Sequence, residues 1–566
     1  FDIDAVGIET LRPVLETKAW VAHNAAFELK FFLHAGLNPT LPHCSMLLAS
    51  AAGFPTSGLK DLVADVLDDQ FPADKGYQRW DWNQELDNEA IQYAAADAIA
   101  TYRLYQSLAP GYGEAAVYAE AMRPCILPVA EIELRGIPAD IEGINALVKE
   151  SEGALASPLA SLRELVGDPN ITPSHTSRLS EWIDAHKPDS TRWPRAEKSG
   201  QYKTDSTTLK RMQEKGKDLG LAAPILDYRR AKKSLDHARA LRDHYSPDTG
   251  CVHGSFKIAG AATGRFSSSD PNLQNVPRDS SVRRQFRAPE GYSLIRADYS
   301  QIELRVAAVH TKCQAMLEAF GQGGDLHDRT ARIITDTPEG QPLPKGARTK
   351  AKAVNFGLLY GQQAKGLIEY ARANYGVKLT PAEASSLRAK FFEAYPEIGH
   401  WHAGIRGREQ DRYVEETALG RVRDLQRTGR GEYWANAHLN TPIQGSAAEI
   451  MQVALVKLRE RLRSLDAWIV STVHDEVLVV ANDDCIKATG QAIYDALIDA
   501  ATAVLPGIPT KNLVQPVVGK TWDEARDDSD QGRWVGSPNR TDPDHQVGAG
   551  QLPEPDQDSN NDRRRN

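Results

Sequence analysis

Cysteine is scarce in this sequence, and the spacing of the few cysteines argues against two classes of protein. The chain has five cysteines in 566 residues, far apart and without a C-x-x-C pair. Zinc ribbons and disulfide frameworks need closely spaced or regularly paired cysteines. We therefore expect free thiols in a reducing compartment, which is the cytoplasm of a bacterial cell or of a host cell if a phage encodes the protein.

Long hydrophobic runs are also missing. No stretch reaches the roughly 18 apolar residues that a membrane helix needs, and 41% hydrophobic with 25% charged residues is typical of a globular protein. The sequence also lacks an initial methionine and a basic-then-apolar signal segment, since it starts with Phe1-Asp2-Ile3-Asp4. We expect no membrane association, and we interpret the start as a cut inside a longer product.

Positive charge is in the minority, but its distribution is uneven. The formal net charge is −9, and residues 527–566 contribute −4 of it through nine acids and five arginines, which leaves −5 for the rest. Residues 229–242 hold six cations against one acid, and residues 345–352 hold four cations and no acid. Phosphate contacts need such local basic stretches rather than a basic total. A basic stretch is also often only a solvated helix face, so it supports nucleic-acid binding weakly.

The apolar pattern changes along the chain. Residues 120–245 have mainly helical periodicity, with a polar, proline-containing interruption over 187–203. Residues 291–306 and 468–481 hold β-branched and apolar runs beside acids, which is typical of strands. A Pro/Gly break at 108–111 indicates the end of a first domain.

Two of these strand patterns place carboxylates at their ends. One apolar run ends at Asp298, just before a helical pattern begins, and Asp475 and Glu476 lie between two apolar runs, as in the turn of a hairpin. Acids from separate strands can hold two Mg²⁺ ions about 3.5–4 Å apart. Either acid motif alone is also consistent with ordinary solvated turn residues.

A third pattern is a stripe of two cations and two aromatics. Arg348, Lys352, Phe356 and Tyr360 are each four residues apart, so on a helix they lie along one face. That order suits a nucleoside triphosphate whose phosphates meet the cations and whose sugar and base meet the rings. A surface cation pair beside core aromatics would give the same spacing.

Together these segments resemble motifs A, B and C of the family A DNA polymerases, the DNA polymerase I family, in the order that the family has. The resemblance runs from near residue 20 to residue 526. Further segments that resemble the family are 263–268, 270–277, 324–327, 440–445 and 519–525.

The resemblance implies a role for each matching residue. Asp298 and Asp475 would bind two Mg²⁺ ions, for which Mn²⁺ can substitute, with Glu476 as an auxiliary catalytic acid and the Tyr299 carbonyl as a further ligand. The residues expected to bind or surround the incoming deoxynucleoside triphosphate are Gln301, Glu303, His327, Arg348, Lys352, Phe356 and Tyr360. Those expected to contact primer–template DNA are Arg265, Asn440, Gln444 and His474. Asn436 departs from the family, whose members often have arginine there.

The front of the chain resembles a different site. Residues 22–28 and 93–97 are similar to the second and third motifs of the 3′→5′ proofreading exonuclease, with Glu28 where the family usually has aspartate. Tyr93 and Asp97 are four apart and would share a helix face. The acids of the first motif are not in this chain, and we interpret Asp2 and Asp4 as structural. We therefore expect little or no exonuclease activity.

The resemblance implies a multidomain α/β fold. We expect a partial ribonuclease-H-like exonuclease domain over 1–107 and a right-hand polymerase after it. Its parts would be a helical thumb and the start of the palm over 108–290, palm with motif A over 291–317, fingers with motif B over 318–438, palm with motif C over 439–526, and a disordered tail over 527–566.

The predicted function is template-directed DNA synthesis in replication or repair, by a monomer with primer–template DNA and deoxynucleoside triphosphates as partners. A single-subunit RNA polymerase is one alternative, and Glu303 argues against it because a glutamate there crowds the 2′ position. A non-catalytic nucleic-acid-binding scaffold is another, and the presence of both Asp298 and Asp475 argues against that. A nuclease without polymerase activity is the weakest option.

Overall fold

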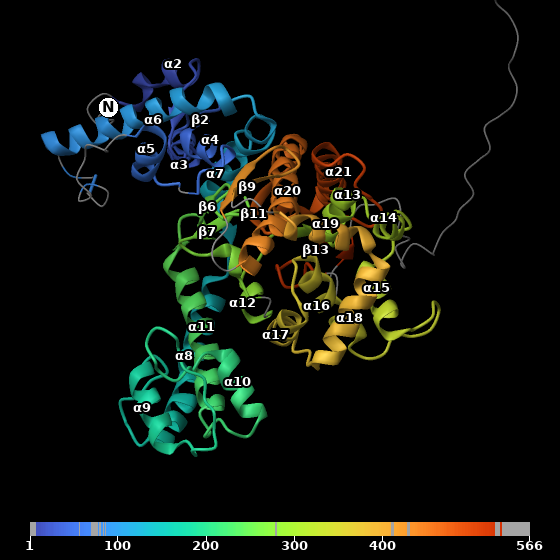
Figure 1. Ribbon diagram of the computed structural model, residues 1–566. Helices are drawn as coiled ribbons and strands as arrows, with labels where there is room; N and C mark the ends of the chain where they lie inside the picture. Colours follow the sequence, from blue (N-terminus) through green and yellow to red (C-terminus); the bar gives the residue numbers. More distant parts are fainter. Residues whose placement is uncertain are drawn as a thin grey trace, which may run out of the picture.

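The structure is a computed structural model that describes residues 7–526 and 533–534, apart from gaps at 56, 69–76, 78–80, 83, 85, 278–279, 409–411 and 427–430. Figure 1 shows an N-terminal part in blue, a helical arm in teal and green, and a body of helices around a sheet in yellow to red. Asp2, Asp4 and the predicted tail, β14 excepted, lie outside the described residues. Among the described helices, none is long and apolar enough to cross a membrane.

The N-terminal part is helical around a short parallel strand pair. Its elements are η1 (Ile8–Thr10), α2 (Arg12–Leu15), β1 (Val21–Ala22), α3 (Ala26–His34), β2 (His43–Cys44), α4 (Ser45–Ala51), α5 (Leu59–Leu67) and α6 (Asn88–Tyr112). β1 pairs with β2 in parallel. Leu47, Leu48, Leu62 and Leu104 are almost fully buried, so α4, α5 and α6 share one apolar core.

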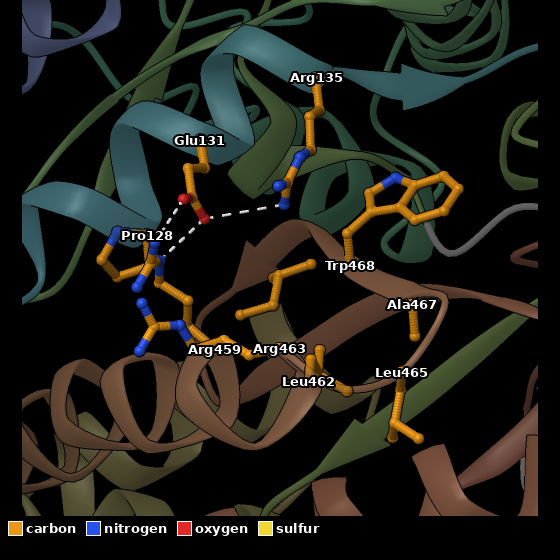
Figure 2. A pocket seen from close by; sticks show the side chains of 10 residues that line it. Pro128, Glu131, Arg135, Arg459, Leu462, Arg463, Leu465, Ala467 and Trp468 are labelled. Atoms are coloured by element: carbon orange, nitrogen blue, oxygen red, sulfur yellow. Dashed lines mark hydrogen bonds and ion pairs between the residues drawn. The ribbon is translucent and has the colours of Figure 1, made fainter. Parts of the chain in front are cut away.

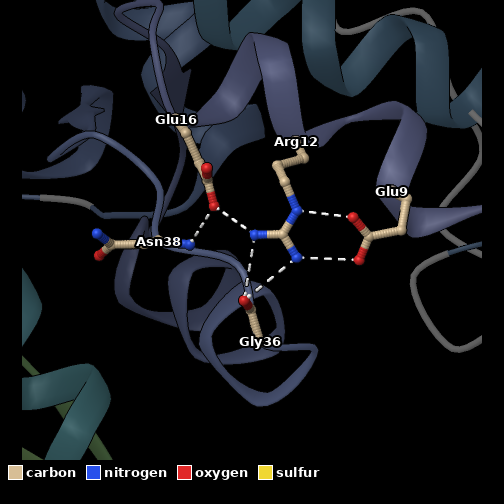
Figure 3. A network of polar contacts seen from close by, with 5 residues as sticks. All are labelled: Glu9, Arg12, Glu16, Gly36 and Asn38. Carbon is tan, nitrogen blue, oxygen red and sulfur yellow. Dashed lines mark hydrogen bonds and ion pairs between the residues drawn. The ribbon is translucent and has the colours of Figure 1, made fainter.

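An arginine network fixes the first helices of this part (Figure 3). Arg12 donates to both carboxylate oxygens of Glu9, at 2.7 and 2.9 Å, and to Glu16 at 2.7 Å. Glu16 also accepts the backbone N–H of Asn38 at 2.8 Å, and Arg12 reaches the Gly36 carbonyl at 3.4 Å. Glu9 and Glu16 therefore have structural partners, which ties α2 to the turn after α3.

The Pro/Gly segment predicted as a break at 108–111 lies inside a helix and does not end it. Helix α6 continues through Pro110 to Tyr112. Proline removes one backbone donor from a helix and clashes with the preceding turn. Here it lies in the last turn, where the Gly113 N–H still bonds to the Ala109 carbonyl at 2.8 Å. The helix therefore ends two residues after the proline, and residue 107 is not an element boundary.

Two long helices form the arm that leaves the body. They are α8 (Ile141–Val166) and α11 (Ala222–Asp243), and α9 (Thr176–His186) and α10 (Ser206–Glu214) pack at the outer end (Figure 1). Asp140 caps α8 by accepting the Gly143 N–H at 3.0 Å. The outer end has its own apolar core, separate from the main one, built from Leu162, Ile171, Leu179, Ile183, Trp193, Tyr202, Leu209, Met212, Leu221, Ala222 and Ile225.

Short elements connect the N-terminal part and the arm to the body. They are η3 (Val117–Met122), α7 (Ile126–Arg135), β3 (Ile137–Pro138), β4 (Tyr245–Ser246), β5 (Cys251–Val252), β6 (Ser255–Lys257), β7 (Ser267–Ser269), η4 (Leu273–Asn275) and α12 (Ser280–Arg283). β3, β5 and β4 form a three-stranded sheet in that order, and β6 pairs with β7.

The body is built on a five-stranded antiparallel sheet of order β11-β12-β8-β13-β14. The strands are β8 (Tyr292–Asp298), β11 (Ala467–Val473), β12 (Glu476–Asn482), β13 (Val517–Gly519) and β14 (Arg533–Trp534). Six of the seven residues of β12 are buried, because helices cover the sheet. Apolar runs of this kind are what a strand buried on both faces requires.

Helices α20 (Gly431–Leu462) and α21 (Ile486–Val504) pack against each other beside the sheet, and η5 (Asp483–Cys485) leads into α21. The remaining helices are α13 (Ile302–Thr311), α14 (Gln314–Gly321), α15 (Leu326–Thr335), α16 (Ala347–Leu359), α17 (Ala364–Tyr375), α18 (Pro381–Ala394) and α19 (Pro396–Arg406). The hairpin of β9 (Arg412–Glu416) and β10 (Val422–Gln426) interrupts a region expected to be helical. Residue 439 lies inside α20, so the expected change from fingers to palm does not coincide with the end of an element.

A polar cavity lies where α7 meets the C-terminal end of α20 and β11 (Figure 2). Arg459 makes a two-pronged bond to Glu131, at 2.9 and 2.7 Å, and Arg135 approaches the same carboxylate at 3.7 Å. The cavity measures about 190 Å³, and Trp468 borders it. The Glu131–Arg459 pair therefore joins α7 to the C-terminal end of α20.

Candidate active site

Strand pairing brings the predicted catalytic acids together. Asp298 is the last residue of β8, and its direct partner across the sheet is Glu476, the first residue of β12. Asp475 precedes Glu476 in the β11–β12 turn, where its backbone carbonyl accepts the Tyr299 N–H at 3.0 Å. His474, with φ of 57°, supplies the left-handed residue that the tight turn needs. The ends of two neighbouring strands thus present three acids at one edge of the sheet.

Charge repulsion acts between two of these acids. Burial, together with the neighbouring Asp298 carboxylate, raises the pKa of Asp475 to about 7, whereas Arg265 opposes the shift. Two carboxylates that disfavour each other's charge are a site where a cation is stabilising. No cluster of three or more His, Cys, Asp or Glu side chains placed to hold a metal occurs among the described residues. The assignment of Asp298 and Asp475 as metal ligands therefore stays a prediction.

Tyr299 contributes its backbone rather than its ring to this edge. Its side chain is buried, and its hydroxyl donates to the Leu497 carbonyl on α21 at 2.7 Å. The ring therefore fixes the end of β8 to the helix behind it. Only the main chain of Tyr299 lies beside the acids.

Glu476 is held more firmly than a turn acid would be. One carboxylate oxygen accepts the indole N–H of Trp522 at 2.7 Å, and the other pairs with Arg296 Nε at 2.7 Å. Arg296 also pairs with Asp298 through Nη2 at 2.9 Å. Sequence reasoning missed Arg296 and Trp522, because neither stands beside Glu476 along the chain.

The predicted cation–aromatic stripe forms on α16. Arg348, Lys352 and Phe356 lie in the helix, and Tyr360 is the residue at its C-terminal end. Between residues 351 and 360 only Lys352, Phe356 and Tyr360 are not buried. The other faces of α16 pack against α15, α17 and α18. The stripe is therefore the accessible face of this helix.

Acids from α15 hold the first cation of the stripe. Asp325 caps α15 by accepting the N–H groups of His327 and Asp328, at 2.7 and 3.2 Å. Its other oxygen accepts a bond from Arg348 Nη2 at 2.5 Å, and Asp328 pairs with Arg348 Nε at 2.9 Å. Arg348 nevertheless keeps 47% of its side chain exposed. It is paired and still accessible.

His327 lies between the two helices as a neutral ring. Burial, together with the charges of Lys352 and Arg348, lowers the pKa of His327 to about 4. Asp325 opposes this shift. Nδ1 contacts the Asn355 amide nitrogen at 2.9 Å, and the ring lies 5.6 Å from that of Phe356. At neutral pH the imidazole can donate one hydrogen bond without adding charge.

Glu303 connects three parts of the site. It lies in the first turn of α13, and its two carboxylate oxygens accept bonds from Arg265 and from the Tyr360 hydroxyl. Tyr360 also shares a hydrogen bond with Gln444 of α20. Gln301, at the start of α13, accepts the Leu326 N–H at 3.2 Å and so joins α13 to α15.

A row of amides on α20 faces the same region. Asn436, Asn440 and Gln444 are four residues apart and half-buried, in a helix whose neighbouring positions are mostly buried. The Asn440 Oδ1 atom is buried and has no hydrogen-bond partner among the described residues. His474 is exposed, and its backbone N–H donates to Gln274 Oε1 at 2.9 Å. Arg265, Gln444 and Tyr360 are linked through the Glu303 network, whereas His474 belongs to the turn that carries Asp475.

Comparisons with known proteins agree with this geometry. The sequence profile described as DNA polymerase family A matches residues 144–524, and a 3′-5′ exonuclease profile matches residues 2–111. The chain belongs to DNA polymerase family A. It is 30% identical to DNA polymerase I of Aquifex aeolicus over 91% of this chain and 90% of that protein. It is 31% identical to DNA polymerase I of Pseudomonas aeruginosa over 93% of this chain, but spans only 58% of that protein.

A solved structure shows the same fold for a polymerase with its substrates. The POL domain of Pol1 from M. smegmatis, in complex with DNA primer-template and dNTP, matches with a TM-score of 0.76 and 25% identity, over 91% of this chain and 88% of that chain. The predicted multidomain α/β polymerase fold and the predicted family are thus confirmed. Family A polymerases are DNA-directed enzymes that use divalent metal ions, and this chain is one of them.

The described residues of the exonuclease-like part of this family A polymerase contain no group of three or more side chains that could hold a metal ion. Glu28 lies on α3, and Tyr93 and Asp97 lie on α6. Burial raises the pKa of Glu28 to about 7. Burial also raises the pKa of Asp97, and the charge of Lys60 opposes this second shift. The profile match confirms the exonuclease-like character of residues 2–111. The expected cut, which would remove the first exonuclease motif, stays a prediction.

Proposed function

We propose that this family A polymerase extends a primer 3′ end with deoxynucleotides, using two Mg²⁺ ions at Asp298 and Asp475, with Mn²⁺ as a substitute. The observation that carries this proposal is the repulsion between the two carboxylates, which helps raise the pKa of Asp475 to about 7. A divalent cation would remove that repulsion, and carboxylate oxygens are the ligands that Mg²⁺ and Mn²⁺ prefer. Bound metal ions would activate the attacking primer oxygen and stabilise the leaving group.

The chain's own residues would position the reactants around that centre. Asp298 and Asp475 are carried by a sheet buried on both faces, so their separation is fixed before substrate arrives. Glu476 would act as an auxiliary acid by holding its neighbours, since both of its oxygens already have partners. The Tyr299 carbonyl would serve as a further ligand from the adjacent main chain.

The accessible face of α16 would bind the incoming nucleotide. Arg348 and Lys352 would pair with the triphosphate, and a neutral His327 would donate one hydrogen bond to it. Phe356 and Tyr360 would pack against the sugar and the base. Gln301 would hold α15, with His327, against α13.

Glu303 would discriminate against ribonucleotides. Its carboxylate is fixed by Arg265 and Tyr360 and is 13% exposed, so it cannot swing away from a 2′-hydroxyl without breaking two bonds. A fixed acid excludes that hydroxyl by space and by desolvation. This supports a DNA rather than an RNA polymerase.

The amide row on α20 would contact primer–template DNA. The buried oxygen of Asn440 has no hydrogen-bond partner among the described residues, Gln444 bonds to Tyr360, and Arg265 and His474 lie near Asp475. Amides and arginine suit the minor-groove acceptors that every base pair presents, which a sequence-independent enzyme needs. Asn436 would provide less phosphate attraction than an arginine. We also propose that the chain works as a monomer in the cytoplasm and that its exonuclease-like part is inactive.

Primer extension by Asp298→Ala and Asp475→Ala variants tests the proposed function. Each should lose at least about 100-fold in rate, about 2.7 kcal/mol of transition-state stabilisation, while primer–template affinity changes little. Asp484→Ala is the matched control, because Asp484 is an exposed acid at the far end of β12. Rates for Asp298→Ala or Asp475→Ala within about tenfold of the unaltered chain would contradict the metal assignment.

A further inference from the structure

An arginine of the chain occupies the place between two of the catalytic-edge acids. Arg296 lies on β8 two residues before Asp298, so both side chains are on the same face of the sheet. Glu476 is the cross-strand partner of Asp298 and shares that face. The Arg296 guanidinium bridges them, with Nη2 2.9 Å from Asp298 Oδ2 and Nε 2.7 Å from Glu476 Oε2.

The Glu476 end of this bridge is immobile. Glu476 is 7% exposed, and Trp522, which is fully buried, donates its indole N–H to the other oxygen at 2.7 Å. Arg283 lies 3.9 Å from that oxygen and stacks on the Trp522 ring at 4.6 Å. Trp522 therefore holds Glu476 in place, and the Glu476–Arg296 pair keeps Arg296 beside Asp298.

The Asp298 end is more accessible. Asp298 keeps 34% of its side chain exposed, whereas Arg296 keeps 13%. The charged groups around this edge are Asp475, Glu303 and Arg265 in addition to the bridge. Without Arg296, Asp298, Asp475 and Glu476 would share the sheet edge with Arg265, which acts on Asp475, and with Arg283, which lies 3.9 Å from Glu476. Neither of these arginines pairs with Asp298 among the described contacts.

We propose that Arg296 is an internal counter-cation of the metal-binding acids, which holds Asp298 while no metal is bound and competes with the metal for it. This inference rests on the proposed metal role of Asp298. A fixed positive charge stabilises the metal-free edge of the sheet and lowers the affinity for a second cation at the same carboxylate. The fold would thus keep its acids in place between catalytic cycles, at a cost in metal affinity.

Removal of Arg296 should separate these two effects. In Arg296→Met the acids lose their counter-cation, so the metal-free protein should melt at a lower temperature than the unaltered chain. Mn²⁺ should then raise the melting temperature of Arg296→Met by more than it raises that of the unaltered chain. The Mn²⁺ concentration at half-saturation should fall by about threefold or more, since one competing close charge pair is removed.

The experiment measures Mn²⁺ binding to the full chain on a primer–template by the electron paramagnetic resonance signal of the free ion, together with thermal unfolding with and without Mn²⁺. Arg283→Met is the matched control, because it also removes an arginine beside Glu476 but does not reach Asp298. It should lower the melting temperature without changing the Mn²⁺ midpoint by more than about twofold. If Arg296→Met does not fold, Arg296→Lys serves, because one ammonium cannot bridge both acids in the same way, and its midpoint should fall by a smaller factor.

An unchanged or higher Mn²⁺ midpoint in the Arg296 variant, or an equal fall in Arg283→Met, would overturn the inference. Asp298→Asn distinguishes this failure from that of the proposed function. If Asp298→Asn binds Mn²⁺ as the unaltered chain does, the metal assignment itself is wrong. If it loses Mn²⁺ while the Arg296 variant binds normally, only the counter-cation role is wrong.

Discussion

The carboxylate of Glu303 accepts a hydrogen bond from the hydroxyl of Tyr360, so α13 and the C-terminal end of α16 meet at one acid. Arg265 bonds to the other oxygen of the same carboxylate. The proposed sugar pocket and the proposed minor-groove contacts therefore share a single side chain.

Glu303→Ala should increase ribonucleotide incorporation, because it opens the space that a 2′-hydroxyl needs. The ratio of kcat/KM for deoxy- to ribonucleotides should fall at least about tenfold, which is about 1.4 kcal/mol of discrimination. Single-nucleotide insertion on a primer–template measures the ratio. Glu318→Ala, on α14, is a suitable control, and an unchanged ratio in Glu303→Ala would show that Glu303 is not the sugar gate.

Phe356→Tyr should improve the use of dideoxynucleotides. Phe356 is the half-exposed ring of the α16 stripe and lacks a phenolic hydroxyl that could take the place of a missing 3′-hydroxyl. Competition between deoxy- and dideoxynucleotides on a defined template measures the effect. Phe392→Tyr, on α18, controls for the added hydroxyl, and equal discrimination in both variants would place Phe356 away from the sugar.

Asp328→Asn should lower KM for the incoming nucleotide. Asp328 pairs with Arg348 at 2.9 Å, and a triphosphate must compete for that guanidinium. Both groups are about half exposed, so the pair contributes about 0.2–1 kcal/mol and KM should fall by up to about fivefold with kcat nearly unchanged. Asp336→Asn, which removes an acid paired with Lys390, is the control. A KM equal to that of the control would mean that the Asp328–Arg348 pair does not weaken nucleotide binding.

Stability should fall as pH rises because of Glu449. Burial raises the pKa of Glu449 from about 4.5 to about 7, although it accepts bonds from Thr417 and from the Leu419 N–H. The folded chain therefore holds a proton that the unfolded chain releases, and the stability present below about pH 5 is lost as pH approaches 7. The effect is about 3 kcal/mol.

Glu449→Gln removes this titration, so its melting temperature relative to the unaltered chain should rise between about pH 5 and pH 8. Thermal unfolding across that range measures the difference. Glu416→Gln, at an exposed position of β9, should show no such trend. Parallel curves for Glu449→Gln and the unaltered chain would mean that Glu449 is not protonated in the fold.

The chain should degrade a labelled single strand slowly or not at all in Mg²⁺ or Mn²⁺. Only Glu28 and Asp97 remain of the expected acids, and the nearby Glu9 and Glu16 are engaged by Arg12. Two ions held close together need more carboxylates than that. Cleavage that disappears in Asp97→Ala would show that other acids complete the site. Polymerase activity should be the same in both proteins, because its acids belong to a separate sheet.

Local patterns explain what the sequence could predict. Asp298 follows an apolar strand, Asp475 and Glu476 occupy a hairpin turn, and the stripe from Arg348 to Phe356 repeats at helical spacing, so each signal lies within about a dozen residues. Helix α6 continues through the expected break near Pro110, because a proline in the last helical turn removes only one bond.

Contacts between distant segments explain what the sequence could not predict. Arg296 looks like an ordinary polar residue of a strand until Glu476 is placed opposite Asp298 by pairing across about 180 residues. Trp522 reaches Glu476 from the end of the chain, and Asp328 reaches Arg348 from another helix. No spacing rule within one element contains these pairs.

The outer end of the helical arm has a hydrophobic core of its own. On heating, the hold on DNA and the nucleotide-addition step should therefore be lost at different temperatures. A region with an independent core can open without the rest of the chain. With the arm as the proposed thumb, its opening would weaken the hold on duplex DNA while Asp298 and Asp475 stay in register in the main core. Rising temperature should then shorten the products made in each binding event before it stops nucleotide addition.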